Sequence, residues 1–390
     1  MKELSNQLMN LPASATMAVT NKAAALKAAG RDVIALAGGD PDFDTPHHIV
    51  AAAFAAIENG ATHYAAPAKG TKPAVEAIAA KYERDTGQSV NPGSQIIVTP
   101  GGKWGINLAL GAMVNPGDEV IVLEPVWVSY VPLIQLHGGI PIGVSLPSER
   151  NFEITEAQLR AHITPKTKVI MVNSPCNPTG RVMTQAEVDA IVTVAVEYDL
   201  YVIYDELYEH LIYDGVHLPL GGLPGMAERT VTINGLSKAY AMTGWRLGWM
   251  VGPEPIVKLA GKLHSQTITC ATTFGMDAIA AALNGPHEIV REMRDSYQAR
   301  RDFMVNALNS IDGIECRSIE GAFYLFPRFT KTERNSIELA SALLEQADVA
   351  GTPGIAFGAA GAGHLRFSIA TAMSDLERAV ERMARVVPML

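Results

Sequence analysis

Short apolar runs alternate with longer amphipathic stretches from about Thr45 to Gly285. The short runs, rich in valine and isoleucine, predict buried strands, and the longer stretches between them predict helices. Glycine or proline interrupts the pattern at Gly60, at residues 115–117 and at residues 137–139. Because this alternation is typical of βαβ units, it predicts an α/β fold whose mostly parallel sheet is covered by helices on both faces.

The pattern changes after Gly285. A charged amphipathic stretch runs from there to Ser310 and predicts one long helix that leads into a smaller α/β lobe. We therefore predict an N-terminal segment, residues 1–44, that packs on the small domain. A large domain follows over residues 45–285, and the small C-terminal domain spans residues 286–390.

One lysine follows the end of a predicted buried strand. Residues 229–234 are mostly apolar or β-branched, a glycine follows, and Ser237 and Lys238 come next. Partial burial and a neighbouring cation such as Arg246 disfavour the ammonium form and favour a nucleophilic free amine. A lysine chosen at random is more often an ordinary surface residue, but the strand end, Ser237 and Arg246 favour a functional role for Lys238.

Two further predicted strands end at polar residues. Residues 200–204 are mostly apolar and lead into Asp205, and a buried carboxylate needs a cationic or protonated partner such as a ring nitrogen. Residues 168–173 lead into a turn in which two prolines restrict the backbone around Asn177. Asn177 and Tyr208 could then donate hydrogen bonds to a ligand oxygen. Asp205 as a plain helix cap, and the Asn177 segment as an ordinary turn, are the alternatives.

A glycine turn separates the strand predicted at residues 95–99 from a helix. Gly101, Gly102 and Lys103 stand where the bare amides of the helix N-terminus form an anion site. The spacing is not that of a Walker loop, and no dinucleotide-binding glycine fingerprint follows a strand, which disfavours a nicotinamide dehydrogenase.

Taken in this order, these motifs resemble the fold-type I, class I aminotransferases that depend on pyridoxal phosphate. The likeness extends from about Ser14 to the C-terminal helix and is strongest to bacterial aspartate aminotransferases, some of which also use prephenate. The resemblance implies a mostly parallel seven-stranded sheet flanked by helices, with a smaller α/β C-terminal domain. It also implies that Lys238 holds the cofactor and that Asp205 binds its pyridine nitrogen, with Asn177 and Tyr208 on its phenolate oxygen. The implied phosphate ligands are Gly101, Gly102, Lys103, Ser237 and Arg246.

Two aromatic residues have roles implied by the same resemblance. Trp127 would stack on the cofactor ring, although a core tryptophan is nearly as common. Tyr64 matches a tyrosine that reaches the phosphate of the neighbouring subunit. The resemblance therefore implies a homodimer with active sites at the subunit interface.

Substrate recognition requires a partner for the α-carboxylate, and the planar fork of a guanidinium suits it. Arg366 lies in a predicted strand after the close-packed glycine and alanine run 358–363, and it matches the carboxylate-binding arginine of the family. Gly39 would line the same pocket, together with Trp127 and Asn177. For the distal carboxylate the resemblance implies Ser14, Thr16 and Lys103, although Lys103 could also be a solvated lysine at a helix start.

This assignment makes aspartate or glutamate the expected amino donor, and 2-oxoglutarate or oxaloacetate the expected acceptor, in a ping-pong reaction. The run 267–276, Asp40 and Trp104 depart from the usual pattern of the family. A transaminase for prephenate, aromatic or another specialised donor therefore stays open, as does a β-lyase on the same fold.

Composition and charge disfavour several kinds of partner and site. The net charge of −9 argues against nucleic acid or an anionic membrane surface as a partner. No apolar run approaches the length of a membrane-spanning helix, and the N-terminus does not resemble a signal peptide, so we expect a cytoplasmic protein. The three cysteines show no paired spacing and predict free thiols, and no cluster has zinc-ligand spacing, so no metal is expected.

Overall fold

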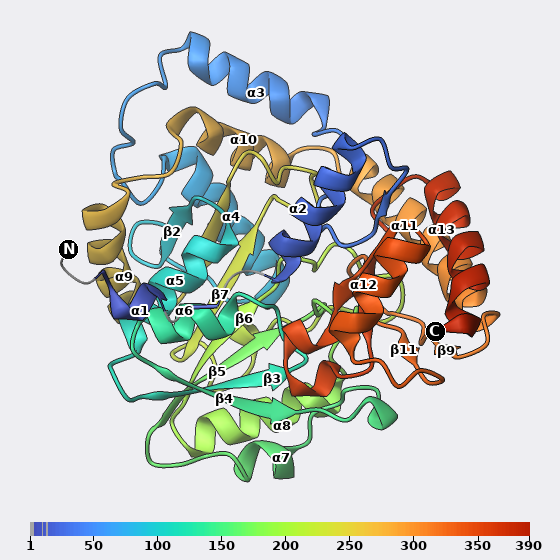
Figure 1. The fold of residues 1–390 in the computed structure, drawn as a ribbon. Coiled ribbons are helices and arrows are strands. Elements are labelled where there is room, and N and C mark those ends of the chain that lie inside the picture. Colours follow the sequence, from blue (N-terminus) through green and yellow to red (C-terminus); the bar gives the residue numbers. More distant parts are fainter. Residues whose placement is uncertain (1–3, 10, 13–14) are drawn as a thin grey trace.

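A computed structural model describes residues 4–9, 11–12 and 15–390 of the chain (Figure 1). Its centre is a seven-stranded sheet with the strand order β2-β8-β7-β6-β5-β3-β4. Only β8 runs antiparallel to its neighbours, which confirms the mostly parallel sheet. The strands are β2 (Ile96–Thr99), β3 (Glu119–Glu124), β4 (Ile140–Ser145), β5 (Thr167–Asn173), β6 (Tyr201–Asp205), β7 (Thr230–Gly235) and β8 (Gly248–Val251).

Helices cover both faces of this sheet because its central strands are apolar on both sides. In β5, Val169 and Met171 point to one face, and Ile170 and Val172 point to the other. The first face packs against α5 (Gly102–Met113), α6 (Tyr130–Leu136) and α9 (Glu254–Thr267). The opposite face packs against α4 (Lys72–Thr86), α7 (Glu156–Arg160), α8 (Gln185–Glu197) and α10 (Thr273–Asn284), and α3 (His47–Glu58) packs against α10.

The C-terminal part begins with α11 (Glu288–Asn309), which confirms the long helix predicted after Gly285. Two more helices and two small sheets follow it. They are α12 (Ser336–Gln346) and α13 (Met373–Val386), the pair β9 (Ile314–Glu315) and β11 (Arg328–Phe329), and the three strands β10 (Tyr324–Leu325), β14 (Leu365–Ser368) and β13 (Thr352–Pro353). Short 3-10 helices are η1 (Ser148–Arg150), η2 (Leu220–Gly222), η3 (Gly354–Phe357), η4 (Ala359–Gly361) and η5 (Val387–Met389).

The N-terminal segment lies against this C-terminal part, as Figure 1 shows for α2 (Ala15–Ala28). It also contains α1 (Asn6–Met9) and β1 (Ile34–Ala35), and β1 pairs in parallel with β12 (Val349–Ala350). Ala23 and Val33 share a small apolar cluster with Leu344 and Ala350. The division of the chain at residues 44 and 285 into three segments remains a prediction.

Several polar sequence motifs meet at one edge of the central sheet. β5, β6 and β7 are parallel, and β2 has the same direction because it is separated from β7 by the antiparallel β8. Their carboxyl ends lead to Asn177, Asp205, Lys238 and the N-terminus of α5. Ligands bind at this edge in open α/β sheets, so the topology gathers these residues at a binding position.

None of the helices in the described ranges is long and apolar enough to cross a membrane.

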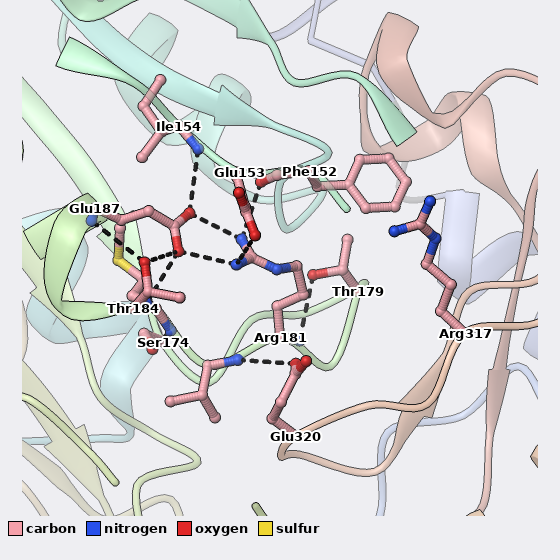
Figure 2. A network of polar contacts seen from close by, with 12 residues as sticks. Phe152, Glu153, Ile154, Ser174, Thr179, Arg181, Thr184, Glu187, Arg317 and Glu320 are labelled. Atoms are coloured by element: carbon pink, nitrogen blue, oxygen red, sulfur yellow. Dashed lines mark hydrogen bonds and ion pairs between the residues drawn. The ribbon is translucent and has the colours of Figure 1, made fainter. Parts of the chain in front are cut away.

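A buried ion pair fixes the start of α8 to the loop before α7 (Figure 2). Arg181 donates from both terminal nitrogens to the carboxylate of Glu187, over 2.9 and 2.8 Å, and also to the carbonyl of Phe152. Glu187 accepts further bonds from the backbone amides of Ile154 and Thr184, the second of which belongs to the capping box of α8. Burial raises the pKa of Glu187, but the guanidinium and these amides more than offset this, and the pKa lies below its usual range.

We expect Glu187→Gln to destabilise the fold by about 3–5 kcal/mol, because it leaves the buried Arg181 without its counter-charge. Unfolding in urea, followed by circular dichroism, measures this loss. Glu381→Gln, an exposed glutamate on α13 with no described ion pair, is the matched control and should change the free energy of unfolding little. Equal stability of the two variants would contradict a stabilising role for the pair.

Candidate active site

A cavity of ≈ 530 Å³ lies at the carboxyl edge of the sheet. Its volume is within the range of roughly 300–1,000 Å³ that is common for small-molecule sites. It collects most residues that the sequence singled out, and its walls include Thr16, Gly39, Gly102, Lys103, Trp127, Asn177, Asp205, Tyr208, Ser237, Lys238, Arg246 and Arg366. Gly101 lies next to Arg246 at the rim. Ser14 falls outside the described residues.

Lys238 follows β7 and reaches into the cavity, where its Nζ atom donates to the carbonyl oxygen of Gly39 over 2.6 Å. Burial lowers the pKa of Lys238 to about 8, with Arg366 and Arg246 acting in the same direction and Asp40 opposing them. An amine with this pKa is unprotonated far more often at neutral pH than an exposed lysine. Lys238 is therefore suited to act as a nucleophile or a base.

Asp205 ends β6 as a buried carboxylate. Its Oδ2 atom accepts a hydrogen bond of 2.6 Å from the hydroxyl of Tyr130, and its Oδ1 atom accepts one from the amide of Leu207. Burial raises the pKa of Asp205 to about 6, although the Tyr130 bond lowers it. No cation pairs with Asp205 within the described part of the chain, so a protonated ring nitrogen in the cavity would satisfy it.

Arg366 lies on β14 as a fully buried cation. It donates to Asn177 Oδ1 over 2.9 Å and to the carbonyl of Ala37 over 2.7 Å, and its guanidinium stacks over the ring of Tyr324 at 4.4 Å. Its Nε atom has no hydrogen-bond partner, and no described carboxylate forms an ion pair with it. Because an unpaired buried charge is costly, this arginine favours an anionic ligand.

Asn177 and Tyr208 lie on the same side of the cavity. The amide oxygen of Asn177 is taken by Arg366, which leaves its amide nitrogen for donation to a ligand. The Tyr208 hydroxyl lies 3.0 Å from the Tyr324 hydroxyl. A Cβ atom at Gly39 would lie 2.5 Å from that Tyr324 oxygen, so only glycine fits at this wall.

The opposite end of the cavity is cationic. The N-terminus of α5 has no side-chain cap, and its first amides lie beside Arg246 and the buried Ser237. Gly101 has φ 84°, and an added Cβ would lie 2.5 Å from a terminal nitrogen of Arg246, so glycine is needed for this close approach. Helix amides and a guanidinium together are suited to bind a phosphate group.

Lys103, Trp127 and Thr16 line a further part of the cavity. The Lys103 ammonium lies 4.9 Å from the centre of the Trp127 ring, and partial burial together with Arg246 lowers the pKa of Lys103. Trp127 packs edge-on against Tyr130, with ring centres 5.6 Å apart. The hydroxyl of Thr16 is buried, and no hydrogen-bond partner for it lies among the described residues. This region therefore offers a positive charge and a free donor to a polar side chain of a substrate.

Tyr64 lies away from the cavity of its own chain. It is 80% exposed and lines a surface depression of ≈ 460 Å³ together with residues 270–274. This run belongs to the segment that departs from the family pattern, and Thr273 donates to the carbonyl of His63 over 2.6 Å. Of the other departures, Asp40 lines the cavity and accepts a hydrogen bond from Thr243, whereas Trp104 lies on α5 and packs against the core.

Two tyrosines of the site were not predicted from the sequence: Tyr130, which donates to Asp205, and Tyr324, which lines the cavity. Tyr130 starts α6 three residues after Trp127, and that spacing at a helix start was the signal available for it. Tyr324 stands in the apolar run 322–326, which looks like ordinary core and gives no such signal.

One group of side chains has the spacing of a metal site. Ligand atoms of Glu206, Glu209 and His217 lie within 4.8 Å of one another. Glu209 is already paired with Lys81 at 2.7 Å, and Glu206 lies 3.3 Å from His217. Lys81 and His217 thus already provide cationic partners for the two carboxylates, and the group is explained as a buried ion network.

One cavity thus brings together a lysine with a lowered pKa, a buried arginine and the uncapped N-terminus of a helix. Residues 31–383 match the family described as aminotransferase class I and II. An aspartate/prephenate aminotransferase from Cereibacter sphaeroides is 42% identical over 97% of both chains, and an aspartate aminotransferase from Streptomyces avermitilis is 42% identical over 96% of this chain and 94% of its own. The structure of Thermus thermophilus aspartate aminotransferase with maleate is 40% identical, has a TM-score of 0.95, and covers 99% of this chain and 100% of its own.

The chain therefore belongs to the class I and II aminotransferase family. It is a transaminase, which confirms the resemblance and the fold-type I architecture predicted from the sequence.

The lowered pKa of Lys238 leads to a direct test in the protein without cofactor. Below pH 8 the amine of Lys238 is mostly protonated, and above that value it is mostly free. An ordinary lysine becomes half deprotonated only at about pH 10.4. We expect acetylation of Lys238 in a pH series, followed by peptide mass spectrometry, to have its midpoint near pH 8. Lys262, exposed on α9, is the reference in the same samples. A midpoint for Lys238 near that of Lys262 would contradict the lowered pKa.

Proposed function

We propose that the chain transfers amino groups between aspartate or glutamate and a 2-oxo acid, with pyridoxal phosphate bound at Lys238. The observation that carries this proposal is the juxtaposition, in one cavity, of a lysine with a lowered pKa and a buried arginine that has no counter-ion among the described residues. The lysine supplies the reactive amine, and the arginine supplies a site for the α-carboxylate that every amino acid and 2-oxo acid carries.

The cavity residues fit this cofactor at both ends. Asp205 is a buried carboxylate without a cationic partner in the part of the chain that the structure describes, which suits a protonated pyridine nitrogen. The uncapped start of α5, with Ser237 and Arg246, suits the phosphate. Asn177 and Tyr208 would donate to the phenolate oxygen, and Trp127 would stack on the ring. When bound, pyridoxal phosphate supplies an electron-accepting ring that stabilises negative charge at the substrate Cα.

The side chains of the protein have separate tasks in this proposal. Arg366 binds the α-carboxylate through its planar fork, and its bond to Asn177 fixes its orientation. Lys238 Nζ takes the proton from Cα and later returns a proton, which requires the neutral amine that burial favours. Tyr130 positions Asp205 and lowers its pKa, which keeps the carboxylate charged.

The donor preference is proposed from the far wall of the cavity. Lys103 and the unpartnered hydroxyl of Thr16 would bind the distal carboxylate of a dicarboxylic substrate, with Ser14 as a further ligand. Support comes from the relatives named aspartate aminotransferase and from the Thermus thermophilus enzyme, whose structure includes maleate, a dicarboxylate. Prephenate is an acceptor to test because the Cereibacter sphaeroides relative is named for it.

We also propose that the enzyme works as a homodimer in the cytoplasm. The exposed Tyr64 would extend into the phosphate site of the partner subunit, and the depression beside it offers a contact surface. All three cysteines are unpaired, which suits a reducing compartment.

The primary test exposes the purified holoenzyme to single amino acids and records the loss of its visible absorbance band. We expect conversion with aspartate and glutamate, formation of the matching 2-oxo acids, and loss of turnover in Lys238→Ala, because that variant lacks the base. Turnover retained in Lys238→Ala would rule out the mechanism. Ammonia and pyruvate released from a β-substituted donor would identify a β-lyase, and conversion with other donors alone would overturn the acidic preference.

The role of Lys103 is tested by Lys103→Met, which keeps the length of the side chain and removes its charge. We expect kcat/KM for aspartate to fall roughly 10- to 100-fold, because one charge-assisted contact to the distal carboxylate is lost. The value for alanine, which has no such group, should change little. Lys262→Met is the matched control on the exposed face of α9. An equal loss for aspartate and alanine would assign Lys103 to the cofactor rather than to specificity.

A further inference from the structure

A second cavity lies on the far side of the segment that carries Asp205 and Tyr208. Its volume is ≈ 330 Å³, and it lies between the C-terminal turn of α4, the end of α10 and the first turns of α11. His210 and Tyr240 complete its wall, two residues after Tyr208 and Lys238 respectively. None of its lining residues belongs to the active-site cavity.

Basic residues line much of this cavity, in a chain whose net charge is −9. Lys81, Arg84, Arg291 and Arg294 line it, whereas Asp85 is the single acidic residue of the wall. Asp85 and the buried Glu209 both pair with Lys81, so the arginines are the cations that a ligand in the cavity can use. Such a concentration of like charge costs free energy unless an anion offsets it.

The three arginines differ in their partners. Arg291 and Arg294 pair with Glu288 and Asp295 on α11, and because these carboxylates are exposed, the pairs are weak. Arg84 is exposed at the end of α4, and no ion pair joins it to any residue in the described ranges. Its guanidinium is therefore available to a ligand.

Tyr240 provides an independent indication of a ligand. The residue is 2% exposed, it lines the cavity, and its hydroxyl is buried without any hydrogen-bond partner in the described structure. Native proteins leave few buried polar atoms unsatisfied, so this hydroxyl requires an explanation. The imidazoles of His210 and His287, with ring centres 6.2 Å apart, are two further donors on the same wall.

We propose that this cavity binds a small multivalent oxyanion, either a phosphoryl or a polycarboxylate group, through Arg84, Arg291, Arg294 and Tyr240. Guanidinium groups bind both kinds of oxyanion in a bidentate manner, and a tyrosine hydroxyl adds a neutral donor. The cavity is larger than a single phosphate requires, which favours an anion with two or more charged groups. The site is separate from the cofactor phosphate and substrate carboxylate sites.

The test measures binding of pyrophosphate and, in a parallel arm, citrate to the holoenzyme by titration calorimetry. The cofactor keeps its own phosphate site filled in these experiments. We expect saturable binding of at least one anion, and the arm with the tighter binding identifies the ligand class. Arg84→Gln should weaken this binding roughly tenfold, because one charge-assisted contact is lost. Arg385→Gln, which removes an exposed and unpaired charge from α13, is the matched control and should bind like the parent chain.

Tyr240→Phe gives a second and independent variant. The hydroxyl has no protein partner, so its removal should leave thermal unfolding without anion unchanged, and should weaken anion binding severalfold. Loss of binding in Arg84→Gln and Tyr240→Phe, with binding retained in Arg385→Gln, would establish the site. Absence of saturable binding for both anions, or binding that neither Arg84→Gln nor Tyr240→Phe weakens, would overturn the proposal.

Discussion

The desolvation of three charged groups in one cavity is the constraint on which the active site depends. Lys238, Asp205 and Arg366 are held close to the same space, yet none forms an ion pair within the described structure. Each unpaired buried charge costs several kcal/mol. At a surface site, water would solvate these groups and the shifts of their pKa values would be lost. The apolar sheet and its two helical layers offset this cost and keep the groups from pairing with one another. The lowered pKa of Lys238 and the raised pKa of Asp205 have the same origin, which is burial at the end of a strand.

Buried ion pairs stabilise the segments that carry these unpaired charges. Glu209, one residue after Tyr208, pairs with Lys81 on α4 and accepts a bond of 2.7 Å from the side chain of Asn234 on β7. This network joins the segment that carries Asp205 to the strand that precedes Lys238. On the same face of the sheet, the pair of Arg181 and Glu187 fixes the chain just after the turn that presents Asn177. Satisfied buried networks are rigid, so the reactive groups keep their geometry although they have no counter-charges of their own.

The sequence was most informative where chemistry coincides with the end of an apolar run. Asp205, Asn177 and Lys238 were found because each follows a predicted strand, and parallel strands bring such ends to one edge. Tyr130 and Tyr324 were missed because their roles depend on how α6 and β10 pack, which local periodicity does not encode. Likewise, the pattern indicated a mostly parallel sheet but could not identify β8 as the antiparallel strand. The role of Tyr64 remains a prediction, since a contribution to another subunit cannot be read from one chain.

The two ends of the active-site cavity differ in how strictly the fold determines them. Gly39, Gly101 and Arg366 are fixed by close contacts, because an added Cβ at either glycine would overlap a functional side chain, and Arg366 is held by two hydrogen bonds. Lys103 is instead a partly exposed side chain whose ammonium contacts only the face of Trp127 among the described side chains. A flexible lysine of this kind can turn away from a substrate that lacks a second carboxylate. The α-carboxylate site is therefore rigid, whereas the side-chain pocket is adaptable. In this arrangement the residues that carry out amino transfer keep their positions. A few residues near Lys103 and Thr16 determine which amino acid enters the cavity.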